Sequence, residues 1–139
     1  MNHEQQRIAT ECADLSEAGK IHFGDLVGRL MAAGIERYHS DYSRMETTFY
    51  TADGGSLVHS MHAAEGAART TVEHAFSAAR IQAAIRQAQR GEIMFPEFTR
   101  LAMSAGCVGY FVQIAGKRVQ YFGRNGDMHT EWFPGAQPQ

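Results

Sequence analysis

The pattern of hydrophobic and polar positions is clearest in the second half of the chain. Apolar residues recur there at the i, i+3, i+4, i+7 spacing of a helix with one buried face: Ile81, Ala84, Ile85 and Ala88. Thr70 and Glu73 have the spacing of a capping box, and Gly91 suits the left-handed conformation just past a helix end. These positions predict a helix over 71–90.

A second helix and three strands are predicted beyond Gly91. Pro96 fits the first turn of a helix over 96–104, and Gly106 stops it. Three segments rich in β-branched and aromatic residues then predict an antiparallel meander with strands over 108–114, 118–122 and 127–133. Ala115-Gly116 is expected to form a two-residue turn, and Asn125-Gly126 a type I′ turn, because both residues accept positive φ.

The first half repeats this pattern at an offset of 72 residues. Glycines, aromatic residues and helix-end residues all match, as in the pairs Gly19/Gly91, Ile21/Ile93, Phe23/Phe95, Asp25/Glu97, Leu26/Phe98, Met31/Met103, Ala33/Ala105, Gly34/Gly106, Tyr38/Tyr110, Phe49/Tyr121 and Gly54/Gly126. The first half is therefore predicted to contain helices over 3–18 and 24–33, strands over 35–42, 46–51 and 56–62, and a linker over 63–69.

The fold class predicted is α+β, a tandem duplication of a unit with two helices and a three-stranded antiparallel meander. We expect repeat one (1–65) and repeat two (66–139) to be related by a pseudo-twofold axis and to form a single domain with one core. A half of about 70 residues would be only marginally stable alone. The matched apolar positions form the expected core: Phe23, Leu26, Leu30, Tyr38, Phe49, Phe95, Phe98, Leu101, Tyr110, Val112, Ile114 and Tyr121.

Composition narrows the function classes. The 139 residues are 44% hydrophobic and 20% charged, with a formal net charge of −2, which disfavours a nucleic-acid binder. No run of 18 apolar residues predicts a membrane span, and the polar residues 1–18 do not form a secretory signal. Cys12 and Cys107 are too few for a disulfide framework, so we expect reduced thiols and a cytoplasmic location.

One segment carries a family resemblance. Gly91 to Pro134 reads GEIMFPEFTRLAMSAGCVGYFVQIAGKRVQYFGRNGDMHTEWFP, and it resembles a bacterial domain-of-unknown-function family often labelled phage envelope protein. The recurring features are Phe95, Phe98, Ala105, Gly106, Tyr110, Tyr121, Asn125, Gly126, Glu131, Phe133 and Pro134. The resemblance implies a small soluble α+β protein, and it brings no activity or catalytic residues.

Four groups of residues resemble a metal site, a catalytic nucleophile, a phosphate loop and a phosphate-binding surface, and each is more simply interpreted as part of the fold. His59 and His62 would point to opposite faces of a strand. No Cys, Asp or Glu at ligand spacing completes a set with them and His74, since Glu65 is the nearest carboxylate, so no metal is predicted. Cys107 follows a helix-ending glycine and matches a core position. The segment 123–127 contains glycine but joins two strands, unlike a phosphate loop. The remaining group is most simply a solvated helix face: Arg69, Arg80, Arg86, Arg90 and Arg100.

The leading hypothesis is a non-enzymatic binding or interaction module without a cofactor, because no residue group above requires catalysis. A small-molecule or protein partner is expected at the junction of the repeats, near His59, Glu131, Trp132 and Phe133, if the two third strands lie side by side. The alternative is a small enzyme that uses His129 and Glu131, which share one face of a strand, as an acid–base pair.

Overall fold

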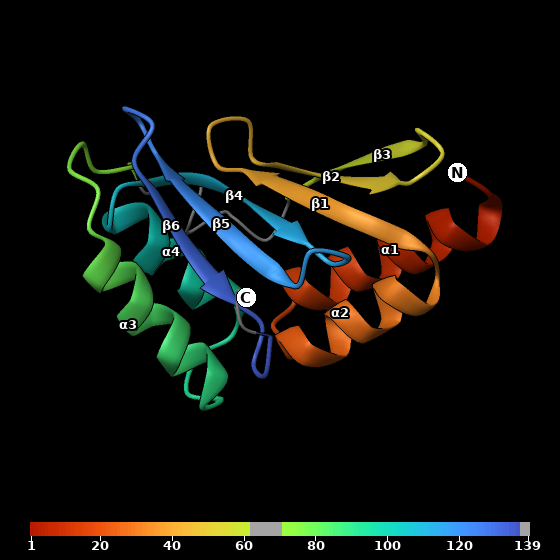
Figure 1. Cartoon of the computed structure of the whole chain (residues 1–139), viewed down its shortest axis with the longest axis horizontal. Coiled ribbons are helices and arrows are strands. Elements are labelled where there is room, and N and C mark those ends of the chain that lie inside the picture. Colours follow the sequence, from red (N-terminus) through yellow and green to blue (C-terminus); the bar gives the residue numbers. More distant parts are fainter. Residues whose placement is uncertain (62–70, 137–139) are drawn as a thin grey trace.

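Two pairs of helices lie on one face of a six-stranded antiparallel sheet in the computed structural model, which describes residues 1–61 and 71–136. Figure 1 shows α1 and α2 at one end of the sheet and α3 and α4 at the other. The helices are α1 (His3–Glu17), α2 (Phe23–Ala32), α3 (Ala78–Gln89) and α4 (Phe95–Ser104). The strands are β1 (Ile35–Asp41), β2 (Glu46–Thr51), β3 (Ser56–Ser60), β4 (Cys107–Gln113), β5 (Arg118–Gly123) and β6 (Met128–Trp132). The chain therefore has the predicted α+β class.

The two halves join in the middle of the sheet, where β1 pairs with β4 in the order β3-β2-β1-β4-β5-β6. His39 lies opposite Phe111, the residue 72 positions later, and their rings stack with centroids 4.3 Å apart. On either side, Arg37 pairs with Gln113 and Asp41 with Gly109, and the offset of 72 exchanges these two pairs. The register is thus symmetric about the His39–Phe111 pair.

Local backbone conformation follows the same offset. Positive φ angles occur at Gly19 and Gly91, at Gly34 and Gly106, and at Gly54 and Gly126. The non-glycine residues with positive φ in the described part of the chain are Met45 (52°) and Lys117 (57°), again 72 positions apart. Non-glycine residues adopt this conformation infrequently, so the match at Met45 and Lys117 indicates the same turn geometry in both halves.

The helix predicted over 71–90 is shorter than expected. It begins at Ala78, and the Ser77 side chain caps it by accepting a hydrogen bond from the Arg80 backbone N–H at 3.2 Å. The backbone N–H of Glu73 instead donates to the Met103 carbonyl at 3.0 Å, so Glu73 lies outside the helix. Thr70, the other half of the predicted capping box, and the predicted linker 63–69 lie outside the described residues.

Both hairpin turns in the second half differ from their predicted types. Gln113 pairs with Arg118, which leaves the four residues 114–117 in the first turn instead of two. In the next turn Gly126 has φ 88° but Asn125 does not have positive φ, so the turn is not type I′. The Gly126 N–H donates to the Gly123 carbonyl at 3.2 Å, the bond expected for a type I turn followed by a glycine bulge.

The buried side chains form one cluster that spans both halves. Most of the predicted core residues belong to it, but Phe23 is 43% exposed and Leu101 is 38% exposed, so these two predictions were wrong. Phe23 lies at the start of α2, where its ring meets Phe133 edge-on at 5.7 Å. Phe95 is half-buried.

Candidate functional site

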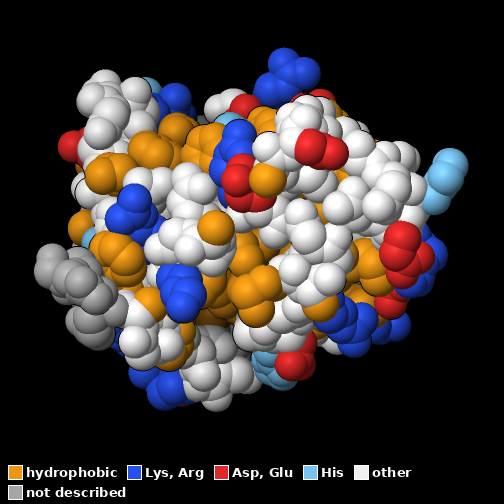
Figure 2. Space-filling model, turned by 45° about the vertical axis from the view of Figure 1, so that its right-hand side comes forward, with side chains coloured by type: hydrophobic (Ala, Val, Ile, Leu, Met, Phe, Trp, Pro, Cys, Tyr) orange, Lys and Arg blue, Asp and Glu red, His pale blue; other side chains and the backbone are white. Residues whose placement is uncertain are grey.

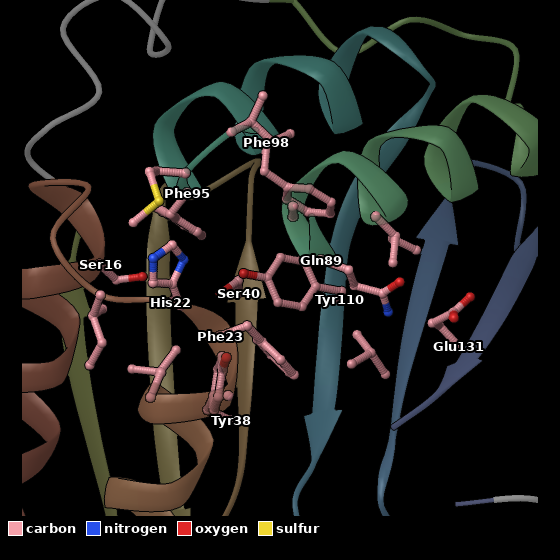
Figure 3. Close-up of a pocket in the computed structure, with 18 of the residues that line it drawn as sticks. Ser16, His22, Phe23, Tyr38, Ser40, Gln89, Phe95, Phe98, Tyr110 and Glu131 are labelled. Atoms are coloured by element: carbon pink, nitrogen blue, oxygen red, sulfur yellow. The ribbon is translucent and has the colours of Figure 1, made fainter. Parts of the chain in front are cut away.

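A cavity of about 630 Å³ lies between the helices and the sheet, and every helix and strand named above contributes to its lining. The inner face of the sheet forms its floor, and Figure 3 shows Tyr38, Ser40 and Tyr110 there below Phe98 of α4. The lining is largely apolar and aromatic: Ala13, Ile21, Phe23, Leu26, Phe49, Ile85, Ile93, Phe95, Phe98, Val119 and Phe133. A cavity of this size accepts a small organic molecule.

The roof of the cavity is made by the two helix–helix loops, 18–22 and 90–94. The loops touch, since a methyl group added to Gly19 would lie 3.6 Å from Met94 Cβ, and one added to Gly91 would lie 4.0 Å from His22 Cε1. The offset of 72 exchanges these two contacts, as it exchanges the pairs around His39 and Phe111. The cavity therefore lies where the two halves of the chain meet.

Neutral hydroxyl groups line the floor. Ser40 Oγ and Thr47 Oγ1 are hydrogen-bonded at 3.0 Å, and the Tyr110 hydroxyl points toward Ser40 in Figure 3. In the described part of the chain, the hydroxyls of Tyr38 and Tyr121 have no hydrogen-bond partner. Burial raises the pKa of all three tyrosines, so the phenols stay protonated and can donate to a ligand.

One charged group lies at the β3 edge of the sheet, against α1. His59 Nε2 is 3.1 Å from Asp14 Oδ1, and His59 Nδ1 is 3.6 Å from Glu17 Oε1. The side chains of His59 and Glu17 are only 13% and 12% exposed, and both line the cavity. At this edge the imidazole therefore lies between two carboxylates.

A second charged group lies at the β6 edge, against α3. Arg86 Nη1 donates to Glu131 Oε2 at 2.7 Å, and Glu131 lines the cavity. His129 Nε2 is 3.5 Å from Glu131 Oε1, and the His129 ring lies over Tyr121 with centroids 6.3 Å apart. At the offset of 72, His59 matches Glu131 and Asp14 matches Arg86, so the carboxylate lies on the helix at the β3 edge and on the strand at the β6 edge.

The condition on which the expected site depended, that the two third strands lie side by side, is not met. β3 and β6 lie at opposite edges of the sheet, because β1 and β4 form the central pair and each meander extends outward from it. His59 and Glu131 are thus not neighbours, but both line the same cavity from its two sides, and Trp132 and Phe133 also border it. The Arg118 guanidinium lies over the Trp132 ring, 5.0 Å from its centroid. His129 is not among the lining residues.

The histidines and cysteines considered as metal ligands or nucleophiles form no reactive site in the described part of the chain. Among the described residues, no group of three or more His, Cys, Asp or Glu is arranged to hold a metal, and His62 lies outside them. Burial raises the pKa of the Cys107 thiol to about 11, which leaves it protonated and unreactive. Cys12 is also free and buried.

The arginine set is dispersed. Arg80 donates to the Ser104 carbonyl at 3.0 Å, Arg86 binds Glu131, and Arg90 pairs with Glu92. Arg100 is exposed on α4, and Arg69 lies outside the described residues. On the face shown in Figure 2, basic and acidic side chains are interspersed among hydrophobic ones. Each helix in the described ranges falls short of the length and apolarity needed to cross a bilayer.

Sequence reasoning missed the polar residues on the cavity floor. Ser40 and Thr47 are 1% and 8% exposed, and each occupies an inward-facing position two residues from a buried aromatic side chain, Tyr38 or Phe49. A buried hydroxyl at such a position is the signal that distinguishes a lined cavity from a plain core, because polar groups seldom face a core without a role. Tyr38, Tyr110 and Tyr121 were predicted as core residues, and they are both buried and cavity-lining.

Comparison with known proteins places the chain in a family. A search of curated proteins finds no match to it. Nothing in the comparisons supports the phage envelope label that accompanied the resemblance. Residues 59–131, more than half of the chain, match the family model described as protein of unknown function (DUF1398), and the chain therefore belongs to this family of unknown function.

Proposed function

We propose that this protein is a non-enzymatic binding module that holds a small, mainly apolar molecule in the cavity between its helices and its sheet. The observation that carries the proposal is the cavity itself, about 630 Å³ in volume. This volume lies within the range of about 300–1,000 Å³ that is typical of small-molecule sites. Its lining of aromatic and aliphatic side chains with a few hydroxyls is also typical of such sites.

The contacts of His129 and Glu131 favour binding over acid–base catalysis. The Glu131 carboxylate already accepts a hydrogen bond from Arg86 at 2.7 Å. His129 is outside the cavity lining, and its Nε2 lies 3.5 Å from the carboxylate, beyond a good hydrogen bond. A general base needs direct reach to a substrate proton, which His129 does not have here.

We also infer that the two halves arose by tandem duplication and form a single domain. Several observations support this inference. The same elements occur twice in the same order, and α2/α4, β1/β4, β2/β5 and β3/β6 begin and end 72 positions apart. The register between β1 and β4 is symmetric about His39 and Phe111. Most cavity-lining residues fall into pairs with the same offset, so the proposed binding site belongs to both halves jointly.

Binding of the neutral fluorophore N-phenyl-1-naphthylamine tests the proposed function. The wild-type protein is expected to bind it with saturable fluorescence enhancement and a stoichiometry of about one, as one cavity requires. Ala88→Trp places an indole in the cavity and is expected to weaken binding at least about tenfold, since the probe and the indole compete for the same volume. Ala83→Trp is the matched control, because Ala83 is an exposed alanine on the same helix.

Two results would overturn the proposal. One is a wild-type protein that shows no saturable binding of the fluorophore. The other is equal binding by the Ala88→Trp and Ala83→Trp variants, when circular dichroism shows that both proteins are folded. The second result would place the bound probe elsewhere on the molecule.

A further inference from the structure

Two neighbouring rows of side chains cross the inner face of the sheet, and the members that line the cavity form its floor. The two rows differ in polarity. The register of all six strands aligns one row across the inner face of the sheet: His59, Thr47, Ser40, Tyr110, Tyr121 and His129. Every member carries a polar group, and we name this the polar row. At its centre Thr47 and Ser40 are hydrogen-bonded, and Tyr110 lies opposite Ser40 in the register.

The adjacent row is mainly apolar. The same register aligns it as Leu57, Phe49, Tyr38, Val112, Val119 and Glu131. We name it the apolar row, although Tyr38 carries a hydroxyl and Glu131 ends it at the sheet edge. The offset of 72 converts each row into the other, so Thr47 matches Val119 and Ser40 matches Val112. The backbone frame is nearly symmetric, but the chemistry of the floor is not.

Two matched pairs on the helix side of the cavity have a polar residue in the first half of the chain and an apolar residue in the second. Ser16 of α1 matches Ala88 of α3, and His22 before α2 matches Met94 before α4. All four residues line the cavity, and Figure 3 shows Ser16 and His22 at one end of it. In the matched pair Phe49 and Tyr121, the polar residue belongs to the second half instead of the first. Tyr121 therefore extends the polar row into the second half. The cavity is thus polar along one side and apolar along the other.

The hydroxyls that face the cavity are neutral, and its carboxylates are engaged. Glu17 lies beside His59 at 3.6 Å, and Glu131 binds Arg86 at 2.7 Å. A ligand charge placed on the floor would meet hydroxyl dipoles without an opposite charge, which leaves much of its desolvation cost uncompensated. A hydroxyl or carbonyl on the ligand would instead exchange hydrogen bonds with the row, as with Tyr121, whose hydroxyl has no partner in the described part of the chain.

Resting on the proposed function, we propose that the ligand is an uncharged amphipathic molecule, with an apolar ring body on the apolar row and a hydroxyl or carbonyl on the polar row. The asymmetry between matched positions such as Thr47 and Val119 also fixes the orientation of the ligand in the cavity. The affinity of the cavity for a ligand would therefore depend on a polar group at one edge of the ligand as well as on the size of the ligand.

Displacement of N-phenyl-1-naphthylamine by three molecules with one ring system tests this inference. The competitors are naphthalene, 2-naphthol and 2-naphthoate, which differ in being apolar, neutral with a hydroxyl, and anionic at pH 7. Wild-type protein is expected to prefer 2-naphthol over naphthalene by about 3- to 10-fold, the effect of one hydrogen bond. It should bind 2-naphthoate more weakly than either.

Two conservative variants should remove this preference, and a third variant, at the position matching Thr47, is the control. Tyr121→Phe and Thr47→Val remove single hydroxyls from the polar row and should bring the 2-naphthol to naphthalene ratio toward one. Val119→Thr adds a hydroxyl at the position matching Thr47 and should not lower the ratio. If Tyr121→Phe does not fold, Thr47→Val, which conserves side-chain shape, decides the outcome.

These experiments distinguish a failure of the proposed function from a failure of the inference about ligand polarity. A wild-type protein that does not bind the fluorophore would overturn the proposed function and this inference with it. Binding of the fluorophore with no preference for 2-naphthol, with a preference for 2-naphthoate, or with a ratio unchanged in both variants would overturn this inference alone.

Discussion

Phe98 and Leu101 lie one helical turn apart on α4, and they differ in how far they reach into the molecule. Phe98 is 9% exposed. Its ring centroid lies 6.5 Å from that of Tyr110 and 6.1 Å from that of Tyr121. Leu101 is 38% exposed. Spacing alone assigned both residues to one buried face, because positions i and i+3 are neighbours on a helix surface.

Phe98→Ala is expected to lower the free energy of unfolding by about 3–5 kcal/mol, because it removes a ring that packs between the floor of the cavity and α4. Leu101→Ala on the same helix is expected to cost less than about 1 kcal/mol. Urea denaturation of both variants provides the comparison. Equal losses in the two variants would contradict the assignment of Phe98 to the core.

His39 gives the fold a dependence on pH. It stacks on Phe111, and burial lowers its pKa, an effect that Asp41 partly offsets. The unfolded chain therefore takes up a proton before the folded one as the pH falls below about 6.5, so stability decreases in that range. In a His39→Phe variant, the part of the decrease due to His39 should disappear.

Melting temperatures of both proteins between pH 7.5 and pH 5.5 measure this effect. The wild-type protein should lose more stability than His39→Phe as the pH is lowered. A parallel decrease in the two proteins would show that the imidazole at position 39 titrates equally in both states.

At the scale of elements, the turns that lead from helix to strand are alike in backbone and unlike in surroundings. Gly34 and Gly106 both have φ +86°. A methyl group on Gly34 would meet only the end of the Gln5 side chain, at 3.2 Å, whereas one on Gly106 would lie 2.2 Å from the backbone oxygen of Ala75. The segment before α3 thus packs directly against the turn between α4 and β4.

Gly34→Ala is expected to destabilise the protein by about 1–2 kcal/mol, the cost of a left-handed conformation for an L-residue. Gly106→Ala adds a collision with backbone and is expected to cost more than about 3 kcal/mol or to prevent folding. Thermal unfolding of the two variants compares them. A smaller loss for Gly106→Ala than for Gly34→Ala would contradict the close approach of Ala75.

Local signals predicted most elements because they act within a few residues. The strand predicted over 46–51 and the helix end at Ser104 agree with the structure. The start of α3 was misplaced because Thr70 and Glu73 have capping-box spacing while Ser77 makes the actual cap. Strand order between the halves depends on contacts far apart in sequence, which periodicity does not encode, so the positions of β3 and β6 were not predictable.

The candidate site was harder to predict than the fold for a physical reason. His59, Glu131, Trp132 and Phe133 do line the cavity, but the reasoning that chose them assumed adjacent strands. A cavity floor has the same alternation of inward apolar residues as a filled core. The distinction lies in how far the helices stand from the sheet, which no local pattern specifies.

At the scale of the whole molecule, the β1–β4 pairing makes each half dependent on the other. It joins the two meanders into one sheet, and the buried cluster extends across it. The helix–helix loops meet on the other side of the cavity. Unfolding should therefore be a single transition, since neither half can lose its partner without exposing the cavity walls and the edge of its central strand.

A fragment of residues 67–139 should self-associate through β4, because β4 occupies the position of β1 in the symmetric register. Sedimentation equilibrium should report a dimer, with Phe111 of one copy opposite Phe111 of the other. Phe111→Lys in the fragment should prevent the association by placing like charges at the centre. A compact monomeric fragment would contradict the dependence between halves.

The near-symmetry of the register has a consequence for recognition. A dimer of two identical halves would present the same surface to a ligand after a half-turn, so a molecule and its reversed pose would bind equally well. Two unlike halves in one chain remove that degeneracy, as the differences between the matched positions Thr47 and Val119, and Ser40 and Val112, illustrate. Joining the halves covalently thus allows the cavity to distinguish the head of an elongated ligand from its tail and to hold it in one orientation.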